Sequence, residues 1–264
     1  MSMKKLLIIF FTILFSTNSS VVYSKGEKYI DSDWNMIFYD QCGFPSTEGK
    51  KQNVKWVEKD EEKFLRFSLY NGQVGKCSAD HKKRIKGEPY LERANIQQWS
   101  KLNKNSQYEI NFRFRIVEGF KSRKEKIFII NSKGSNNFNK CSKTPLFLQF
   151  SGRKNPKGLR LHLLDLTNNK ETFKKYKLEY NHSKIQVHKL INKWTNLKFL
   201  INFNQNDAIL DLFFNEEKII SGLKFDVPCN NIRMSIGLER HGNSEKKHAL
   251  SVIDYDKFIV NKVN

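Results

Sequence analysis

Patterns that define several large classes of protein are absent from this chain of 264 residues. It has only five prolines, and no segment rich in proline, glycine or serine marks a domain boundary. Its longest apolar run, Leu6–Phe15, has ten residues, whereas a membrane-spanning helix needs about 20. No heptad, collagen-like or longer repeat is present. With 21 phenylalanines and nine tyrosines the chain is too apolar to be disordered, so we expect one folded domain over residues 25–264.

The motifs of several enzyme classes are also absent. There is no Gly-x-Ser-x-Gly elbow, no phosphate-binding loop and no Cys-x-x-Cys or Cys/His cluster. The one alternating acidic row, Glu58, Asp60 and Glu62, is interleaved with further charged residues, so it has no core-facing side and indicates a charged hairpin turn. A glycoside hydrolase needs two carboxylates held together on a folded face. We therefore expect no catalytic metal, no organic cofactor and no hydrolase.

The first 24 residues have the pattern of a secretory signal peptide. Lys4 and Lys5 precede the apolar run, and a cleavage site follows Ser24. No cysteine follows the run closely, which argues against a lipid anchor; an uncleaved anchor is the alternative. Cleavage removes two lysines and no acidic residue, so the net charge falls from +20 to +18. The expected product is a monomer in the periplasm or outside the cell, with no membrane contact.

All four cysteines lie in the part of the chain that remains after cleavage: Cys42, Cys77, Cys141 and Cys229. An even number of cysteines in an oxidising compartment indicates disulfides, and four cysteines allow three pairings. The sequence does not choose between these pairings.

Acidic residues are scarce relative to basic ones, with 27 Asp and Glu against 47 Lys and Arg. This excess has two interpretations: a solvated lysine-rich surface, or a surface that binds a polyanion. No nucleic-acid-binding motif is present, and nucleic acid is not an expected partner of an exported protein. An acidic polysaccharide is therefore the partner that we expect.

Strand patterns dominate the sequence, and strands do not alternate with helices. Residues 108–116 alternate strictly between apolar residues and charged or amide residues. Similar patterns, separated by turn-forming residues, cover 55–57, 64–70, 92–98, 126–131, 145–150, 159–164, 194–203, 209–214, 218–220, 232–238 and 249–260. Residues 165–190 are ambiguous. The pattern as a whole predicts an all-β, antiparallel β-sandwich with a concave groove.

The most informative strand covers residues 92–98. Arg93, Asn95 and Gln97 share one face, and Ala94 and Ile96 point the other way, toward the core. A row of one arginine and two amides is unusual on a solvated strand. Arginine binds a carboxylate through two parallel hydrogen bonds, and amides hydrogen-bond sugar hydroxyls.

Four blocks of the sequence, in the same order, resemble the jelly-roll polysaccharide lyases, the heparin-lyase-like and alginate-lyase-like families with a concanavalin-A-like sandwich. Glu92-Arg93-Ala94-Asn95-Ile96 resembles their Glu-Arg-Ala-Glu-Leu element. Residues 193–215 resemble a tryptophan-led strand pair that ends in an asparagine turn. Residues 232–240 resemble the Lys-x-Gly-x-Tyr-Arg strand, and residues 252–256 resemble the closing strand with its aspartate.

The resemblance implies cleavage of a uronic-acid polysaccharide by β-elimination. In this reaction a base removes the proton at C5 and an acid protonates the glycosidic oxygen at C4, while cationic and amide donors neutralise the carboxylate. The residues implied to contact the substrate on neighbouring strands are Arg93, Asn95, Gln97, Asn131, Arg233 and Glu239.

This chain departs from the family pattern where the base and acid are expected. Asn95 replaces the glutamate of the first block, and Glu239 stands where the family has tyrosine. The nearest match to the family's Gln-x-His is Asn131-Ser132-Lys133. We therefore take Lys133 or His241 as the candidate base, Lys133 only if burial or nearby cations lower its pKa. Tyr90 is the candidate acid, with a packing role as the alternative.

Two further pairs of residues are candidates. Arg160 and His162 share a strand face opposite three leucines and line either a groove or a solvated surface. Asp254 and Asp256 either bind a structural Ca²⁺ or lie on a plain surface.

Two non-catalytic interpretations stay open. A protein that only binds an acidic polysaccharide would use the same groove without a working base and acid, which agrees with the altered positions. The second interpretation is an exported structural β-sandwich whose basic residues contact only solvent.

Overall fold

The structure is a computed structural model that describes residues 28–29, 34–39, 53–70, 91–98, 100–120, 124–134, 141–151, 158–167, 170–241 and 250–263. The expected signal peptide, Cys42, Cys77 and Tyr90 lie outside the described residues. None of the described residues forms a helix long and apolar enough to span a membrane.

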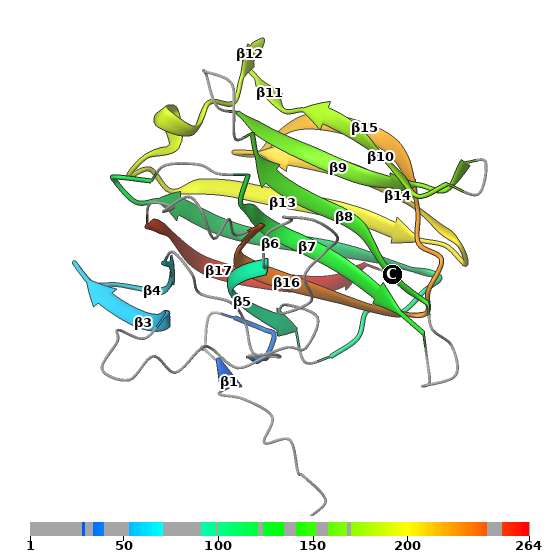
Figure 1. The fold of residues 1–264 in the computed structure, drawn as a ribbon, viewed down its shortest axis with the longest axis horizontal. Helices are drawn as coiled ribbons and strands as arrows, with labels where there is room; N and C mark the ends of the chain where they lie inside the picture. The colour runs from blue at the N-terminus through cyan, green and yellow to red at the C-terminus, as the bar shows by residue number, and fades with distance from the viewer. Residues whose placement is uncertain are drawn as a thin grey trace, which may run out of the picture.

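The architecture is two large antiparallel sheets, whose strands run roughly side by side across the view (Figure 1). Sheet A contains, in spatial order, β1 (Lys28–Tyr29), β2 (Phe38–Tyr39), β5 (Leu91–Gln98), β16 (Asn231–His241), β7 (Lys126–Lys133), β8 (Ser142–Phe150), β9 (Leu159–Asp165) and β10 (Thr172–Lys177). Sheet B contains β15 (Glu217–Asp226), β14 (Asp207–Phe214), β13 (Thr195–Phe203), β6 (Ser106–Ile116), β17 (Ser251–Val263), β4 (Glu62–Leu69) and β3 (Val54–Lys59).

The core lies between the inner faces of the two sheets. Strict alternation in β6 buries every second side chain, from Tyr108 to Ile116, and leaves the interleaved polar residues partly exposed. Phe112 of sheet B contacts Phe128 of sheet A, with ring centroids 5.3 Å apart, and Phe128 also packs against Phe199 at 4.7 Å. These aromatic contacts hold the sheets together and confirm the predicted sandwich.

Short turns join neighbouring strands of sheet B. The β3–β4 hairpin turns at Asp60 and Glu61, and the β14–β15 hairpin at Asn215 and Glu216; all four residues have positive φ. Paired positive φ values suit two-residue hairpins because their twist matches that of the strands. The acidic turn and the β13–β14 hairpin, both expected from the sequence, are therefore confirmed.

Residues 165–190, which the sequence leaves ambiguous, contain mainly short elements. They comprise β10, the small hairpin of β11 (Glu179–Tyr180) and β12 (Ser183–Lys184), and the 3₁₀ turn η3 (Val187–Leu190). The hairpin lies at the upper border of the molecule in Figure 1. Alternation has no room to repeat in elements of two to four residues, so periodicity does not identify them.

Candidate functional site

The outer face of sheet A, turned away from sheet B, carries the row predicted from β5. Ala94 and Ile96 are buried in the core, so Arg93, Asn95 and Gln97 face outward, as expected. The antiparallel register with β16 sets Gln97 opposite Ser235, Asn95 opposite Gly237 and Arg93 opposite Glu239.

Gly237 allows β5 and β16 to approach closely. Its φ is +120°, and a Cβ atom at this position would lie 2.4 Å from the carbonyl oxygen of Ala94 and 2.6 Å from the Phe67 ring. No other residue type fits this backbone without moving the strand.

A hollow of about 230 Å³, here called the Arg233 pocket, opens on this face where β5 and β7 end and β16 begins. Its cationic side chains are Lys101, Lys133 and Arg233, and none of the three forms an ion pair with a described residue. Three amides complete the polar lining: Gln97, Asn131 and Asn231. No Asp or Glu is among its described lining residues, so the pocket favours an anion. The structure thus brings together four site residues predicted from the sequence: Gln97, Asn131, Lys133 and Arg233.

Tyr39 of β2 also belongs to this site, although no sequence pattern singles it out. The Arg233 guanidinium donates a hydrogen bond from Nη1 to the Tyr39 hydroxyl at 2.6 Å. The same hydroxyl donates to Oε1 of Gln97 at 3.3 Å. Tyr39 lies opposite Gln97 in the sheet register. A two-residue strand has no periodic signal, and only the pairing of β2 with β5 reveals the position.

Asn131 is held in place by its neighbours on both sides. Its Nδ2 donates to the Ser235 hydroxyl at 3.4 Å, and its Oδ1 accepts from the Thr144 hydroxyl at 3.3 Å. The amide is therefore oriented at the pocket wall before any ligand arrives, which reduces the entropy cost of binding.

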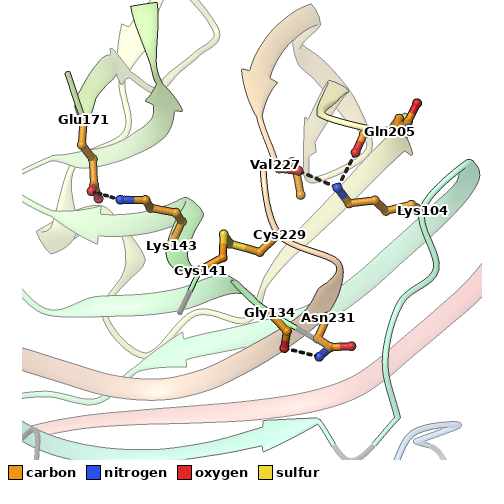
Figure 2. Close-up of a disulfide and its surroundings, with 9 residues drawn as sticks. All are labelled: Lys104, Gly134, Cys141, Lys143, Glu171, Gln205, Val227, Cys229 and Asn231. Atoms are coloured by element: carbon orange, nitrogen blue, oxygen red, sulfur yellow. Dashed lines mark hydrogen bonds and ion pairs between the residues drawn. A yellow bond between two sulfur atoms is a disulfide. The ribbon is translucent and has the colours of Figure 1, made fainter. Parts of the chain in front are cut away.

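The Cys141–Cys229 disulfide lies beside Gly134 and Asn231 (Figure 2). These two residues line one side of the Arg233 pocket. Cys141 precedes β8, and Cys229 lies two residues before Asn231, which is the first residue of β16. Asn231 Nδ2 donates to the carbonyl of Gly134 at 2.6 Å, and the Gly134 amide donates to the carbonyl of Cys141 at 2.7 Å. The disulfide and these two hydrogen bonds join the start of β16 to the end of β7.

The electrostatics of the pocket act on Lys133. Partial burial of its side chain, together with the charges of Arg233 and Arg93, lowers the pKa of Lys133 from its ordinary value. A lowered pKa is the condition under which Lys133 can act as a base.

Arg93 occupies a different environment. Its guanidinium lies 3.8 Å from Glu239, whose other oxygen accepts a hydrogen bond from Lys126 at 2.9 Å. Burial raises the pKa of Glu239, but Lys126 and Arg93 outweigh this effect, so the pKa is lowered overall. Glu239 is therefore an internal anion that competes with a substrate carboxylate for Arg93. Arg233, which has no such competitor among the described residues, is the more available guanidinium.

The remaining predicted site residues lie away from the Arg233 pocket. His241 is eight residues from Arg233 along β16, roughly 26 Å by strand rise. Arg160 and His162 lie on β9, three strands from β16 in sheet A. Tyr90 lies outside the described residues. Of the two candidate bases, only Lys133 is at the pocket.

His162 is buried and not solvated. It is 6% exposed and stacks on Phe147, with ring centroids 4.3 Å apart. Burial and the charges of Lys175, Arg160 and Lys126 lower the pKa of His162 to about 4. The imidazole is therefore neutral at pH 7.

The two aspartates considered for Ca²⁺ are bound by arginines on the outer face of sheet B. Asp254 accepts hydrogen bonds from Arg66 at 2.7 Å and from Arg115 at 3.0 Å, and Asp256 pairs with Arg113. No group of three or more potential metal ligands is present among the described residues. Guanidinium groups already neutralise these carboxylates, which argues against a calcium ion there.

No model of a known protein family matches the sequence, and no curated protein matches it. Solved structures do match. A glucuronan lyase from the fungus Trichoderma reesei is 11% identical with a TM-score of 0.53, and the match covers 84% of this chain and 92% of that one. An alginate lyase from Pseudomonas aeruginosa is 12% identical with a TM-score of 0.53, covering 81% and 88%. An alginate lyase in complex with dimannuronate is 9% identical with a TM-score of 0.51, covering 89% and 88%.

The chain therefore has the fold of the jelly-roll polysaccharide lyases. The resemblance and fold class predicted from the sequence are confirmed. At these identities the comparison establishes the fold, and the assignment of function rests on the site.

Proposed function

We propose that the protein is a polysaccharide lyase that cleaves a uronic-acid polymer by β-elimination at the Arg233 pocket. The observation that carries this proposal is the lining of the pocket on a lyase fold: its described residues include three cationic side chains and three amides, and none of them is acidic. The neighbouring structures are lyases of glucuronan and alginate, which supports a uronate substrate.

Charge neutralisation is the first requirement of the reaction. Removal of the C5 proton next to a carboxylate creates an enolate-like dianion, which a neighbouring cation must stabilise. Arg233 supplies a fixed guanidinium, and Asn131 and Gln97 supply oriented amides. We assign the substrate carboxylate to these three side chains, with Asn95 contacting a neighbouring hydroxyl on the same face.

Lys133 is the proposed base. Its neutral amine takes the C5 proton, and the electrons of the C–H bond form the C4–C5 double bond as the C4–O bond breaks. The lowered pKa of Lys133 increases the fraction of neutral amine at a given pH. The amine then returns its proton to water.

Tyr39 is the proposed acid. The jelly-roll lyases have a tyrosine at the position that Glu239 occupies here, and we assign the role of that tyrosine to Tyr39. The Tyr39 hydroxyl gives its proton to the departing C4 oxygen, and the resulting phenolate keeps the hydrogen bond from Arg233. Arg233 thus stabilises both the substrate carboxylate and the deprotonated tyrosine. Water reprotonates Tyr39 after product release.

Export is part of the proposal. It rests on the signal-peptide pattern of residues 1–24 and on the Cys141–Cys229 disulfide, which fits an oxidising compartment such as the periplasm or the extracellular space.

Glu239 favours a second candidate, a non-catalytic protein that binds an acidic polysaccharide. A carboxylate in place of the family's tyrosine removes one proton donor and occupies Arg93. In this alternative the Arg233 pocket still binds the uronate carboxylate, and neither Lys133 nor Tyr39 transfers a proton.

The deciding experiment uses residues 25–264 with alginate, glucuronan and a panel of other acidic polysaccharides. β-Elimination creates a C4–C5 double bond conjugated to the carboxylate, which absorbs in the ultraviolet. We expect absorbance to rise with one substrate class, and to rise far less with Arg233→Ala than with Arg160→Ala, a matched loss of one arginine outside the pocket. Salt-sensitive binding without absorbance would support the non-catalytic candidate. Absence of both would refute both candidates.

A further inference from the structure

We propose that a second pocket, remote from the first, binds a segment of acidic polysaccharide and holds the polymer on the enzyme. It lies between the β11–β12 hairpin, η3, the start of β13 and the end of β14, and it encloses about 270 Å³. None of its lining residues lines the Arg233 pocket. We call it the lysine pocket.

Three lysines define the charge of this pocket: Lys184, Lys189 and Lys193. All three are exposed, and none forms an ion pair with a described residue. No Asp or Glu is among the described residues that line the pocket. Three like charges around one hollow repel each other, and an anion in the hollow relieves that repulsion.

The clustering is a product of the fold. Lys184 ends the small hairpin, Lys189 lies in η3 and Lys193 lies two residues before β13, so three consecutive segments of the chain fold around one hollow and each contributes one ammonium group. On a surface whose lysines are merely solvated, these side chains would be expected to point apart and not to line one hollow.

Aromatic side chains give the lysine pocket an apolar floor. Tyr180 packs on Phe214 with ring centroids 4.9 Å apart, and both line the hollow with Trp194. The Trp194 indole is fixed from outside, because Nε1 donates to Glu62 at 2.9 Å and Arg115 lies 4.4 Å from the ring centroid. Tyr180 and Trp194 are half-buried and Phe214 is buried beneath them. Rigid, partly exposed rings such as Tyr180 and Trp194 suit the apolar face of a pyranose at low entropy cost.

Neutral polar groups complete the lining. Ser183, Gln186 and Asn215 offer one hydroxyl and two amides to the hollow. Asn215 Oδ1 accepts from the backbone amide of Asn196 at 2.9 Å, which holds that side chain in place. Cations for carboxylates, amides for hydroxyls and rings for the sugar face together match an acidic sugar.

Such a site would increase the local concentration of polymer at the Arg233 pocket. A long chain could contact both pockets, whereas a tetrasaccharide occupies one at a time. The lysine pocket therefore contributes to the affinity for polymer and not to the chemical step.

The test compares two triple variants that lose the same charge. One is Lys184→Gln/Lys189→Gln/Lys193→Gln; the control is Lys55→Gln/Lys224→Gln/Lys262→Gln, which changes exposed lysines outside both pockets. Binding to alginate, glucuronan and heparin, the last as a sulfated probe, is measured by calorimetry at constant ionic strength, and the melting temperature of each variant checks folding.

We expect the pocket variant to bind its preferred polymer roughly tenfold more weakly than the control variant. Cleavage of an alginate or glucuronan tetrasaccharide should be equal in the two. Equal polymer binding by both variants would overturn the inference. The binding measurement needs no catalysis, so it tests the lysine pocket even if the protein is not a lyase. Cleavage of the tetrasaccharide by both variants would support the lyase proposal. Polymer binding alone decides whether the lysine pocket binds polysaccharide.

Discussion

At the scale of single residues, the proposed chemistry depends on a tyrosine that two hydrogen bonds place at the pocket. Tyr39→Phe removes the hydroxyl and keeps the ring, so we expect kcat to fall about 10²- to 10⁴-fold with little change in substrate binding. Steady-state kinetics on the preferred polymer measures this. Tyr176→Phe, on β10, is the matched control, and a Tyr39→Phe enzyme with normal kcat would exclude Tyr39 as the acid.

Lys133 predicts the pH dependence of the reaction. Only its neutral form accepts a proton, so kcat/KM should rise with pH and level off above the pKa of Lys133, below the ordinary lysine value. Arg233→Gln removes one of the charges that lower this pKa, so the rising limb should move to higher pH. A pH profile of each variant shows the shift. An unchanged limb, or full activity in Lys133→Ala, would contradict the assignment.

The lowered pKa of His162 predicts that the stability of the protein depends on pH. Its pKa is about 4 in the folded protein, against 6.5 for an ordinary histidine, so the unfolded state binds the proton more readily. As pH falls from 6.5 to 4, protonation of the unfolded chain should reduce the free energy of unfolding by about 3 kcal/mol. Urea unfolding of wild type and His162→Gln at both pH values isolates this contribution. The difference in free energy of unfolding between the two proteins should change with pH. A difference that stays constant would contradict the lowered pKa of His162.

At the scale of elements, the disulfide between the regions before β8 and β16 supports the wall of the Arg233 pocket. The two cysteines are 88 residues apart in sequence. Cys141→Ser/Cys229→Ser should lower the free energy of unfolding by about 4 kcal/mol, because the unfolded chain regains the entropy that the cross-link removes.

The same double variant should also weaken polymer binding, since Asn231 and Gly134 lose their support. Chemical denaturation and calorimetry measure the two effects. Loss of stability with unchanged binding would show that the disulfide supports the sandwich alone.

At the scale of the whole molecule, the excess of basic residues predicts a strong effect of salt. Affinity for an acidic polysaccharide should fall as ionic strength rises through about 0.1 M, because counterions screen the lysines and arginines of both pockets. Binding in a salt series gives the slope, with a neutral glucan as the control. A salt-independent affinity would mean that charge does not drive recognition.

Most of the fold was predictable from the sequence because strand alternation is a local property. The alternating residues of β6 and the outward row of β5 required only the two-residue period of a strand. The short elements between 165 and 190 and the two-residue strand β2 were not predictable, because tertiary contacts and not periodicity stabilise them.

The candidate site was predictable only in part. Gln97, Asn131, Lys133 and Arg233 were singled out from the sequence and share one pocket. The choice between Lys133 and His241 required the strand register, which separates the two by most of the length of β16. Arg93 was expected to bind the substrate carboxylate, but the register of β5 with β16 places its guanidinium next to the Glu239 carboxylate.

By itself, the sequence determined the class of fold, the positive charge and the face on which the polar row lies, because these follow from composition and from the period of each strand. The tertiary structure alone decided which residues meet. Strand order brings Tyr39 to Arg233, the disulfide joins β16 to the β7–β8 region, and Phe214 of β14 meets Tyr180 in the second pocket. Such contacts depend on long-range pairing, which no local pattern records.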